Sequence, residues 1–313
     1  MRRLAMVRDT GPMWSDGIDT WYAAHGRHDL PWRQTTDPWA VLVSELMLQQ
    51  TSVARVLPRW ERFVRRWPDP VSCASAPLDA VLREWQGLGY PRRARWLWLI
   101  AGRVSEGGWP PGEDGLRTLP GVGRYTARAL LAFSDIGADA GSPPPCDVNI
   151  GRVAARAALG REPHELAPSV LDRTIAGGRP HTLRVRDYAY AMFDVGAIHC
   201  RATPRCHSCA LEAVCALRGN GTPVARRRAA PPYRGSLREL RGTILAAALA
   251  DMQRHGAALV EAGMHVPGAT GERCLEAVSG LIADGLLDPG RAVDPGAASS
   301  AEVTAAVAAP SRR

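Results

Sequence analysis

The sequence contains no lysine, and this absence excludes one class of chemistry. All 39 basic side chains are arginines, set against 31 acidic ones, which gives a formal net charge of +8 and a pI near 9.5. Without lysine, no side-chain amine is available to form a Schiff base with a carbonyl or an opened sugar. The positive charge favours a polyanionic partner, although a basic surface without such a partner would have the same composition.

Long hydrophobic segments are also missing. No run approaches the about 18 to 20 apolar residues of a membrane span, and no apolar stretch followed by a cleavage site stands near the beginning. Apolar residues still make up 46% of the 313 residues, enough to bury the cores of two domains. We therefore expect a cytoplasmic protein that does not bind membranes, with an unstructured N-terminus over residues 1–13.

Alternating strand patterns are absent from residues 14–219, where helical spacing recurs with Pro and Gly at the breaks. Asp37 and Pro38 form an N-cap and first-turn pair before an apolar segment that ends at Leu48. Further helices are expected at residues 78–85, 92–104, 125–133, 148–159 and 186–198. The predicted fold class is therefore all-α.

The composition changes near residue 220. Residues 220–235 are rich in Gly, Pro and Arg, and we expect a linker there. Amphipathic helices are expected at 236–254 and 272–284, and residues 285–289 could add a short strand. A small α or winged-helix-like module is therefore predicted over 236–290. The Ala, Ser and Pro content of 291–313 predicts a disordered tail.

Seven cysteines in a chain without a secretory signal argue against a disulfide framework. Cys73, Cys146 and Cys274 are scattered, and we interpret them as buried thiols. The remaining four are clustered, with five, two and five residues between them: Cys200, Cys206, Cys209 and Cys215. Four thiolates can hold Zn²⁺ or a [4Fe–4S] cluster. Since only one pair has the spacing of a zinc knuckle, the pattern favours the cluster and leaves zinc open.

A glycine hairpin separates two helical segments at Leu119-Pro120-Gly121-Val122-Gly123. Gly121 and Gly123 permit a tight turn, and the main-chain N–H groups there and at the start of the next helix, near Thr126, can approach a phosphate closely. An ordinary turn between helices is the alternative interpretation.

Two carboxyl groups complete the candidate chemistry. Glu45 lies in an otherwise apolar helix, where burial would raise its pKa and suit it to act as a general acid; an ion pair with a nearby arginine is the alternative. Asp147 precedes the helix at 148–159, and a plain N-cap is its alternative role. One acid that protonates a leaving group and one carboxylate that stabilises a sugar cation form the recurring solution for cleaving a glycosidic bond.

On these residues the chain resembles the adenine DNA glycosylases, the MutY family of the helix-hairpin-helix glycosylase superfamily. The resemblance extends from about residue 21 to residue 215. The motifs that carry it are Leu30-Pro31-Trp32-Arg33, Met47-Leu48-Gln49-Gln50-Thr51 after Glu45, Gly87-Leu88-Gly89-Tyr90, the glycine hairpin, Asp147-x-Asn149 with Arg152-Val153, and Met192-Phe193-Asp194-Val195-Gly196-Ala197 before Cys200.

The resemblance implies an architecture and a partner. A six-helix barrel domain with the helix-hairpin-helix would span residues 36–143. An iron–sulfur cluster domain would comprise 14–35 and 144–219, with the four clustered cysteines as ligands of a [4Fe–4S] cluster. The implied partner is double-stranded DNA in which adenine is mispaired with 8-oxoguanine or guanine. The enzyme would be a monomer of the bacterial cytoplasm, at the nucleoid when it acts.

The resemblance also implies a role for each matching residue. Glu45 would protonate the departing adenine, and Asp147 would stabilise the sugar cation, assisted by Tyr125 and Asn149. Gln50 and Tyr90 would wedge into the base stack while the adenine is flipped out. The resemblance further implies that four residues of the hairpin and the following helix contact DNA: Gly121, Val122, Gly123 and Thr126. Trp32 and Arg33 would line the base pocket.

Three alternatives are weighed against this assignment. Endonuclease III-like glycosylases use a hairpin lysine to cut the strand, but Tyr125 takes that position here, so we expect a monofunctional enzyme. Thymine or uracil mismatch glycosylases also resemble the chain at Tyr125, but they lack the Gln-Gln-Thr helix. A catalytically inactive DNA-binding homologue is disfavoured because both carboxyl groups are present.

The sequence departs from the family pattern in three places. The first cysteine spacing is five residues where the family usually has six. Residues 137–145 look like a small insertion before Asp147. Residues 220–290 hold too few strand patterns and aromatic residues for the Nudix-like C-terminal domain that many members carry.

Overall fold

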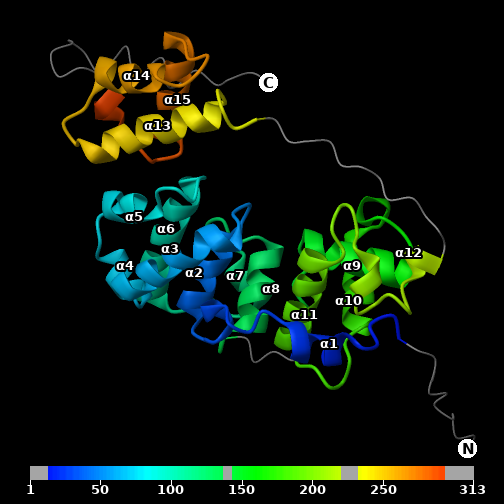
Figure 1. Ribbon diagram of the computed structural model, residues 1–313. Helices are drawn as coiled ribbons and strands as arrows, with labels where there is room; N and C mark the ends of the chain where they lie inside the picture. Colours follow the sequence, from blue (N-terminus) through cyan, green and yellow to red (C-terminus); the bar gives the residue numbers. More distant parts are fainter. Residues whose placement is uncertain (1–12, 137–142, 220–231, 293–313) are drawn as a thin grey trace, which may run out of the picture. The chain divides into compact units, whose positions relative to one another are not determined.

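The computed structural model describes residues 13–136, 143–219 and 232–292, and every regular element in these ranges is a helix (Figure 1). The all-α prediction is confirmed. None of these helices is both long and apolar enough to cross a membrane. Nearly all of the predicted unstructured N-terminus, most of the predicted insertion and linker, and nearly all of the predicted tail lie outside the described residues.

The described residues form two compact units. The first unit holds the described parts of 1–41, 111–118 and 122–228, and the second holds those of 42–110, 119–121 and 229–313. The domain boundaries expected from the sequence stay a prediction.

The first unit is built around α9. Its elements are α1 (Ile18–His25), η1 (Pro31–Arg33), α7 (Gly112–Leu116), α8 (Arg124–Phe133), α9 (Val148–Leu159), η2 (Pro163–Glu165), α10 (Pro168–Gly177), α11 (Val185–Ile198), η3 (Cys206–Ser208) and α12 (Ala216–Gly219). Helix α9 packs against α10, α11 and α12. Its residues Ile150 and Val153 are almost fully buried, and each such side chain stabilises the fold by about 1.5 to 3 kcal/mol. The N-terminus of α9, where Asp147 stands, is therefore firmly anchored.

The second unit is built around α6. Its elements are α2 (Pro38–Leu48, whose first residues belong to the first unit), α3 (Val53–Arg66), α4 (Pro70–Ala74), α5 (Leu78–Trp85), α6 (Arg92–Gly107), α13 (Leu237–Ala250), α14 (Gly256–Met264), α15 (Gly271–Ala283) and η4 (Pro289–Ala292). Helix α6 packs against α4 and α5. Helix α13 packs against α14 and α15, and also against α5. We call α13 to η4 the C-terminal module.

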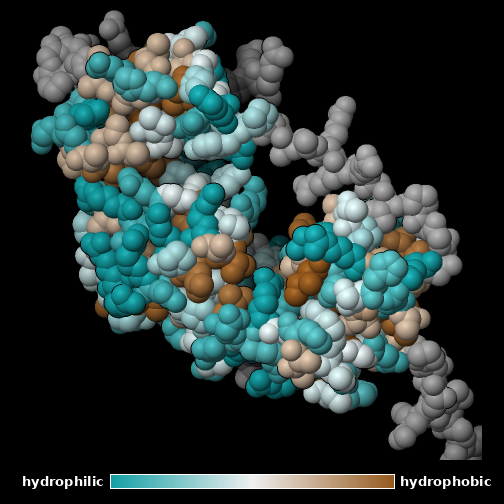
Figure 2. All heavy atoms as spheres, viewed as in Figure 1, coloured by the Kyte–Doolittle hydropathy of each residue, from teal (hydrophilic) through white to brown (hydrophobic). Residues whose placement is uncertain are grey.

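Helix α3 illustrates how these elements form from the sequence. Its residues Val56, Trp60 and Phe63 recur at helical spacing and are buried on one face. The ring of Phe63 meets that of Trp85 on α5 edge-on, with centroids 6.3 Å apart. Polar residues fill the opposite face of α3, and hydrophilic side chains dominate the surface over α4 and α5 that Figure 2 displays.

The C-terminal module differs from the prediction in two respects. Helix α14 was not predicted, and residues 285–289, which could have formed a short strand or wing, do not form one. Gly285 instead adopts a left-handed φ of 63°, and its N–H donates to the carbonyl of Ile282 at 2.8 Å. The N–H of Leu286 donates to the carbonyl of Leu281 at 2.9 Å. This pair of bonds is a Schellman motif that closes α15, and η4 follows it, so the predicted strand was wrong.

Candidate active site and cysteine cavity

Glu45 lies on α2 among buried apolar residues. Asp37 caps this helix, because the N–H groups of Trp39 and Ala40 donate to its carboxylate at 3.2 and 3.0 Å. The N-cap predicted from the sequence is confirmed. Every residue from 40 to 47 is buried, and Glu45 itself is 7% exposed. The carboxyl group of Glu45 is therefore largely removed from solvent.

Gln50 and Tyr90 come together beyond the end of α2. The Tyr90 hydroxyl donates to Gln50 Oε1 at 2.7 Å, and both residues are exposed. Their φ values are 55° and 49°, and no other non-glycine residue in the described ranges has a positive φ. A left-handed conformation costs a non-glycine residue about 1 to 2 kcal/mol, so surrounding contacts must hold these two in place. We call the pair the wedge, after the role that the family resemblance implies.

A buried arginine that the sequence analysis did not identify supplies those contacts. Nη1 of Arg93, on α6, donates to the carbonyls of Leu46 and Gln49 at 2.6 and 2.5 Å. Its Nη2 donates to the carbonyl of Gly89 at 3.0 Å. Arg93 thus satisfies carbonyls at the C-terminal end of α2 and ties them to the loop that carries Tyr90. Burial lowers the pKa of Arg93 to about 10, which leaves it charged at neutral pH.

The glycine hairpin requires glycine at one position for two reasons. Gly121 has a φ of 74°, and a Cβ atom there would lie 2.2 Å from the Trp96 ring. Gly123 has a φ of −87°, faces open space, and is the N-cap of α8, where no side chain caps the helix. The side chains of Val122 and Thr126 are buried. A phosphate at this turn would therefore meet main-chain N–H groups.

Asp147 is the N-cap of α9, and three N–H groups hold its carboxylate. Oδ1 accepts from the main-chain N–H groups of Asn149 and Ile150 at 2.8 and 2.7 Å, and Oδ2 accepts from Asn149 Nδ2 at 2.8 Å. Burial raises the pKa of Asp147, while these hydrogen bonds and the charge of Arg152 oppose the rise. Asp147 is thus the helix cap of the plainer interpretation and also a desolvated carboxylate with fixed oxygens.

Arg152 connects this carboxylate to the cysteine segment. Its Nη2 donates to Asn149 Oδ1 at 2.8 Å, which directs the amide NH₂ of Asn149 towards Asp147. Its Nε donates to the carbonyl of Cys200 at 2.5 Å. One arginine therefore fixes both the partner of Asp147 and the first of the clustered cysteines.

The four clustered cysteines line one cavity of about 170 Å³, together with Arg156 and His199. Arg156 is 3% exposed, and its Nη1 lies 3.8 Å from Cys200 Sγ. Within the described ranges, no three His, Cys, Asp or Glu side chains converge as they would around a single metal ion. All four clustered cysteines nevertheless border the same cavity. Burial raises the pKa of the Cys200 thiol, and the charge of Arg156 opposes that rise.

Trp32 and Arg33 form part of a buried wall. Trp32 is 4% exposed. Nη1 and Nη2 of Arg33 bind the Asp194 carboxylate at 2.8 and 2.9 Å, and the guanidinium lies 4.4 Å from the ring centroid of Tyr190. Burial raises the pKa of Asp194, but the hydrogen bonds and charges of Arg33 and Arg27 outweigh it, and the pKa lies below its ordinary value. Asp194 was noted only as a member of the motif before Cys200, and its ion pair with Arg33 was not predicted.

The remaining predicted residues are divided between the two units. Tyr125 stands in the first turn of α8, with its ring edge-on to that of Phe193 at 6.4 Å. Among the scattered cysteines, Cys73 and Cys274 are buried as expected, whereas Cys146 is only half-buried. Asp147, Asn149, Tyr125 and the clustered cysteines belong to the first unit, and Glu45 and the wedge belong to the second.

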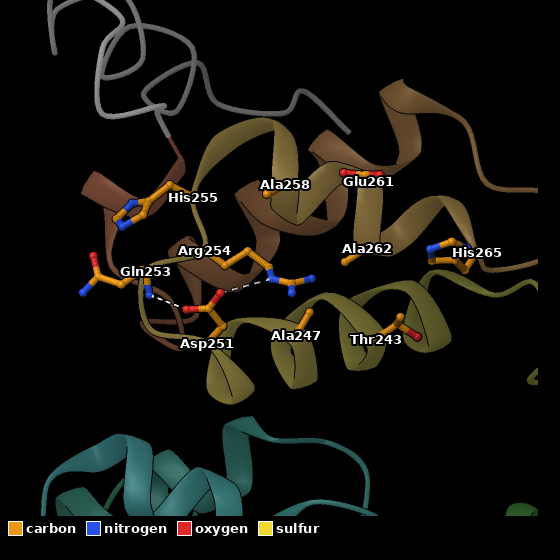
Figure 3. Close-up of a pocket in the computed structure, with 10 residues that line it drawn as sticks. All are labelled: Thr243, Ala247, Asp251, Gln253, Arg254, His255, Ala258, Glu261, Ala262 and His265. Atoms are coloured by element: carbon orange, nitrogen blue, oxygen red, sulfur yellow. Dashed lines mark hydrogen bonds and ion pairs between the residues drawn. The ribbon is translucent and has the colours of Figure 1, made fainter.

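The C-terminal module has a cavity of its own, of about 750 Å³ (Figure 3). Asp251, Arg254, His255, Glu261 and His265 are among its lining residues. Asp251 accepts from the N–H of Gln253 at 2.9 Å and pairs with Arg254 at 3.9 Å. None of the site residues predicted from the sequence lines this cavity.

Comparison with known proteins places these features in one family. The HhH-GPD superfamily of base excision DNA repair proteins matches residues 43–168. The adenine DNA glycosylase of Mycobacterium tuberculosis is 42% identical over 234 residues, which cover 72% of this chain and 75% of that protein.

Solved structures extend the comparison to the fold. A thermostable thymine-DNA glycosylase superposes with a TM-score of 0.56 at 25% identity, covering 66% of this chain and 95% of that one. A trapped endonuclease III–DNA covalent intermediate gives a TM-score of 0.51 at 21% identity, covering 66% and 95% respectively. The second likeness concerns the fold alone.

Proposed function

Because this chain belongs to the adenine DNA glycosylases of the HhH-GPD superfamily, we propose that it removes adenine from a mispair with 8-oxoguanine or guanine, with Glu45 and Asp147 as catalytic residues. It is an adenine DNA glycosylase of base excision repair, a hydrolase of N-glycosidic bonds. The opposite base, the residue roles and the cluster are our proposals.

The contrast between the two carboxyl environments carries the proposed chemistry. Glu45 is buried in an apolar helix, and it would act as the general acid that donates a proton to the departing base. Asp147 accepts from three N–H groups at a helix N-terminus, and these bonds oppose the rise in its pKa that burial causes. It would stabilise the positive charge that develops on the sugar, after which water completes the hydrolysis.

Other residues would present the adenine to these groups. The wedge of Gln50 and Tyr90 would enter the base stack, whose disruption costs a few kcal/mol per step. The hairpin at Gly121 and Gly123 would hold a phosphate through its main-chain N–H groups. Asn149 would orient Asp147, and Tyr125 would pack beside the reacting sugar. Trp32 and Arg33 would form the wall behind the base.

We infer that Cys200, Cys206, Cys209 and Cys215 hold a [4Fe–4S] cluster. Their common cavity and the adjacent Arg156 support this donor set. When bound, the cluster would stabilise the cysteine segment and position it for DNA, without redox turnover. Arg152 donates both to the Cys200 carbonyl and to Asn149 Oδ1, so an ordered cysteine segment would also hold Asn149 in place.

Single-turnover base release tests the proposal. The duplexes would be identical except for the target pair: A opposite 8-oxoguanine, A opposite G, A opposite T, U opposite G, and T opposite G. We expect adenine release only opposite 8-oxoguanine and G, and a rate reduction of at least about 100-fold in Glu45→Gln with duplex binding retained. Release of T or U would assign the protein to the mismatch glycosylases. Binding without any release would identify an inactive homologue.

A further inference from the structure

The C-terminal module reaches the wedge through one arginine. Arg238, in the first turn of α13, donates from Nη1 to the Tyr90 hydroxyl at 2.9 Å. That hydroxyl donates in turn to Gln50 Oε1 at 2.7 Å. All three side chains are exposed. Arg238 of the module, Tyr90 and Gln50 therefore form a chain of hydrogen bonds. The last two are the residues proposed to enter the base stack.

The module is fixed to the helices that support the wedge. Arg83 on α5 donates from Nε to the carbonyl of Leu249 on α13 at 3.1 Å. Asp284, at the end of α15, pairs with Arg92 of α6 at 3.5 Å and with Arg241 of α13. The guanidinium of Arg92 lies 5.3 Å from the ring centroid of Trp96. This ring is the one that a Cβ atom at Gly121 would meet. One helix, α6, thus supports the wedge, the hairpin and the module.

The charge of Arg238 is available to a ligand. No carboxylate of the described residues pairs with it. The nearest candidate in sequence, Glu239, accepts instead from the N–H of Gly235 at 2.6 Å, and Asp284 is occupied by Arg92 and Arg241. An exposed guanidinium can donate to phosphates and to acceptor atoms of bases. In 8-oxoguanine N7 carries a proton and the C8 carbonyl is an additional acceptor, so the acceptors that a guanidinium meets differ from those of guanine.

We propose that Arg238 is a specificity-determining residue. It holds Tyr90 and Gln50 in the arrangement that inserts into DNA, and it contacts the strand opposite the excised adenine, where 8-oxoguanine offers one carbonyl oxygen more than guanine. The C-terminal module thereby contributes to the choice of the opposite base. This inference rests on the proposed function and assigns to the module a role in the same site.

A pair of matched variants tests it. Arg238→Gln removes the guanidinium beside the wedge, and Arg234→Gln removes another exposed charge four residues earlier, just before the module. Single-turnover adenine release is measured opposite 8-oxoguanine and opposite G. We expect Arg238→Gln to lower the rate opposite 8-oxoguanine about tenfold and to lower it less opposite G, so that the ratio of the two rates falls. Arg234→Gln should leave the ratio unchanged.

Further readouts separate this role from loss of structure. Tyr90→Phe breaks the same chain of hydrogen bonds from the other side and should lower the same ratio, while thermal unfolding of both variants should match the wild type. In the Glu45→Gln background, 2-aminopurine at the target position should unstack less when Arg238 is replaced. Equal loss on both duplexes, or equal effects of the Arg234 and Arg238 variants, would overturn the proposal. A wild-type protein that releases no adenine would instead refute the proposed function, and the fluorescence assay would still decide the role of Arg238.

Discussion

At the scale of single residues, the Asn149 amide is one of several donors that lower the pKa of Asp147. Asn149 Nδ2 donates to the carboxylate and lowers its pKa, against the rise that burial causes. In Asn149→Ala this donor is lost, so the pKa of Asp147 should rise further. If the ionised form is required for catalysis, the acid limb of base release should move to higher pH, and the maximal rate should fall about tenfold. A pH–rate profile under single-turnover conditions measures both effects.

A neighbouring substitution serves as the control for this prediction. Val148→Ala changes a residue of the same helical turn whose side chain is 71% exposed, and it should leave the acid limb in place. An acid limb that is the same in Asn149→Ala and the wild type would mean that Asp147 does not set it.

Single residues also mark where sequence reasoning stops. Glu45 and Asp147 could be proposed from the sequence. The proposed chemistry needs carboxyl groups, and each of the two stands out in its local sequence, one in an apolar helix and one before a helix. Arg93 could not, because its partners lie up to 47 positions away and are main-chain carbonyls, which carry no sequence signal. Asp194 binds Arg33 across 161 positions. Such contacts exist only once the elements have packed.

At the scale of elements, the hairpin offers two glycines with opposite expectations. Gly121→Ala should destabilise the protein by about 2 kcal/mol or more, because alanine is strained at a φ of 74° and its Cβ would meet the Trp96 ring. Gly123→Ala meets no neighbour within 4 Å and should cost at most about 1 kcal/mol as an altered N-cap. If a phosphate binds the N–H groups of this turn as proposed, Gly123→Ala should nevertheless weaken duplex binding several-fold, since the new methyl group would stand in the path of that phosphate.

Chemical unfolding and a binding titration distinguish the two outcomes. If Gly123→Ala bound the duplex like the wild type, the hairpin would be an ordinary turn. If Gly121→Ala were as stable as the wild type, the ring of Trp96 would have to move away at little cost.

The connection between α11 and the N-terminal segment depends on Asp194. Its carboxylate is fully buried and binds Arg33, and it also accepts from the main chain of Arg27 at 2.9 Å. Asp194→Asn should lower the free energy of unfolding by about 3 to 5 kcal/mol, because a buried guanidinium loses its partner. Asp187→Asn, which breaks the exposed pair with Arg184 on the same helix, should cost less than about 1 kcal/mol.

The effect should depend on pH with a defined sign. The pKa of Asp194 is lower in the folded protein than in the unfolded chain. Its contribution is therefore fully present above the unfolded-state pKa and is lost as the pH falls through the folded-state value. The difference between Asp194→Asn and the wild type in urea unfolding should shrink on acidification, and a difference independent of pH would contradict this account.

Elements were predictable where local signals agreed. The helix α5 begins and ends as expected, and so does α9, because apolar spacing and the breaking residues coincide there. Helix α14 was missed because its residues are nearly all small or apolar, so that no helical alternation of polar and apolar positions marks it. The apolar pair Leu286 and Leu287 suggested a strand, yet both are buried as the end of a helical turn. A short apolar run does not distinguish the two, and the left-handed Gly285 decides between them.

At the scale of the whole molecule, charge and the absence of lysine act together. The net charge of +8 comes entirely from an excess of arginine over acidic residues. A guanidinium group can form bidentate hydrogen bonds to a phosphate. Arginine remains protonated and forms no Schiff base, so these side chains can contact DNA phosphates without placing an amine near the sugar.

This composition predicts a glycosylase without strand-cutting activity of its own. After adenine release the abasic site should stay intact, and strands should break only after alkali. Borohydride added during turnover should trap no covalent protein–DNA species, because no lysine can form the imine that borohydride reduces. The informative control is Tyr125→Lys, which introduces one amine at the start of α8. If Tyr125 faces the sugar as proposed, this variant should become trappable, whereas a wild-type protein that is itself trapped would require another nucleophile, such as the terminal amine.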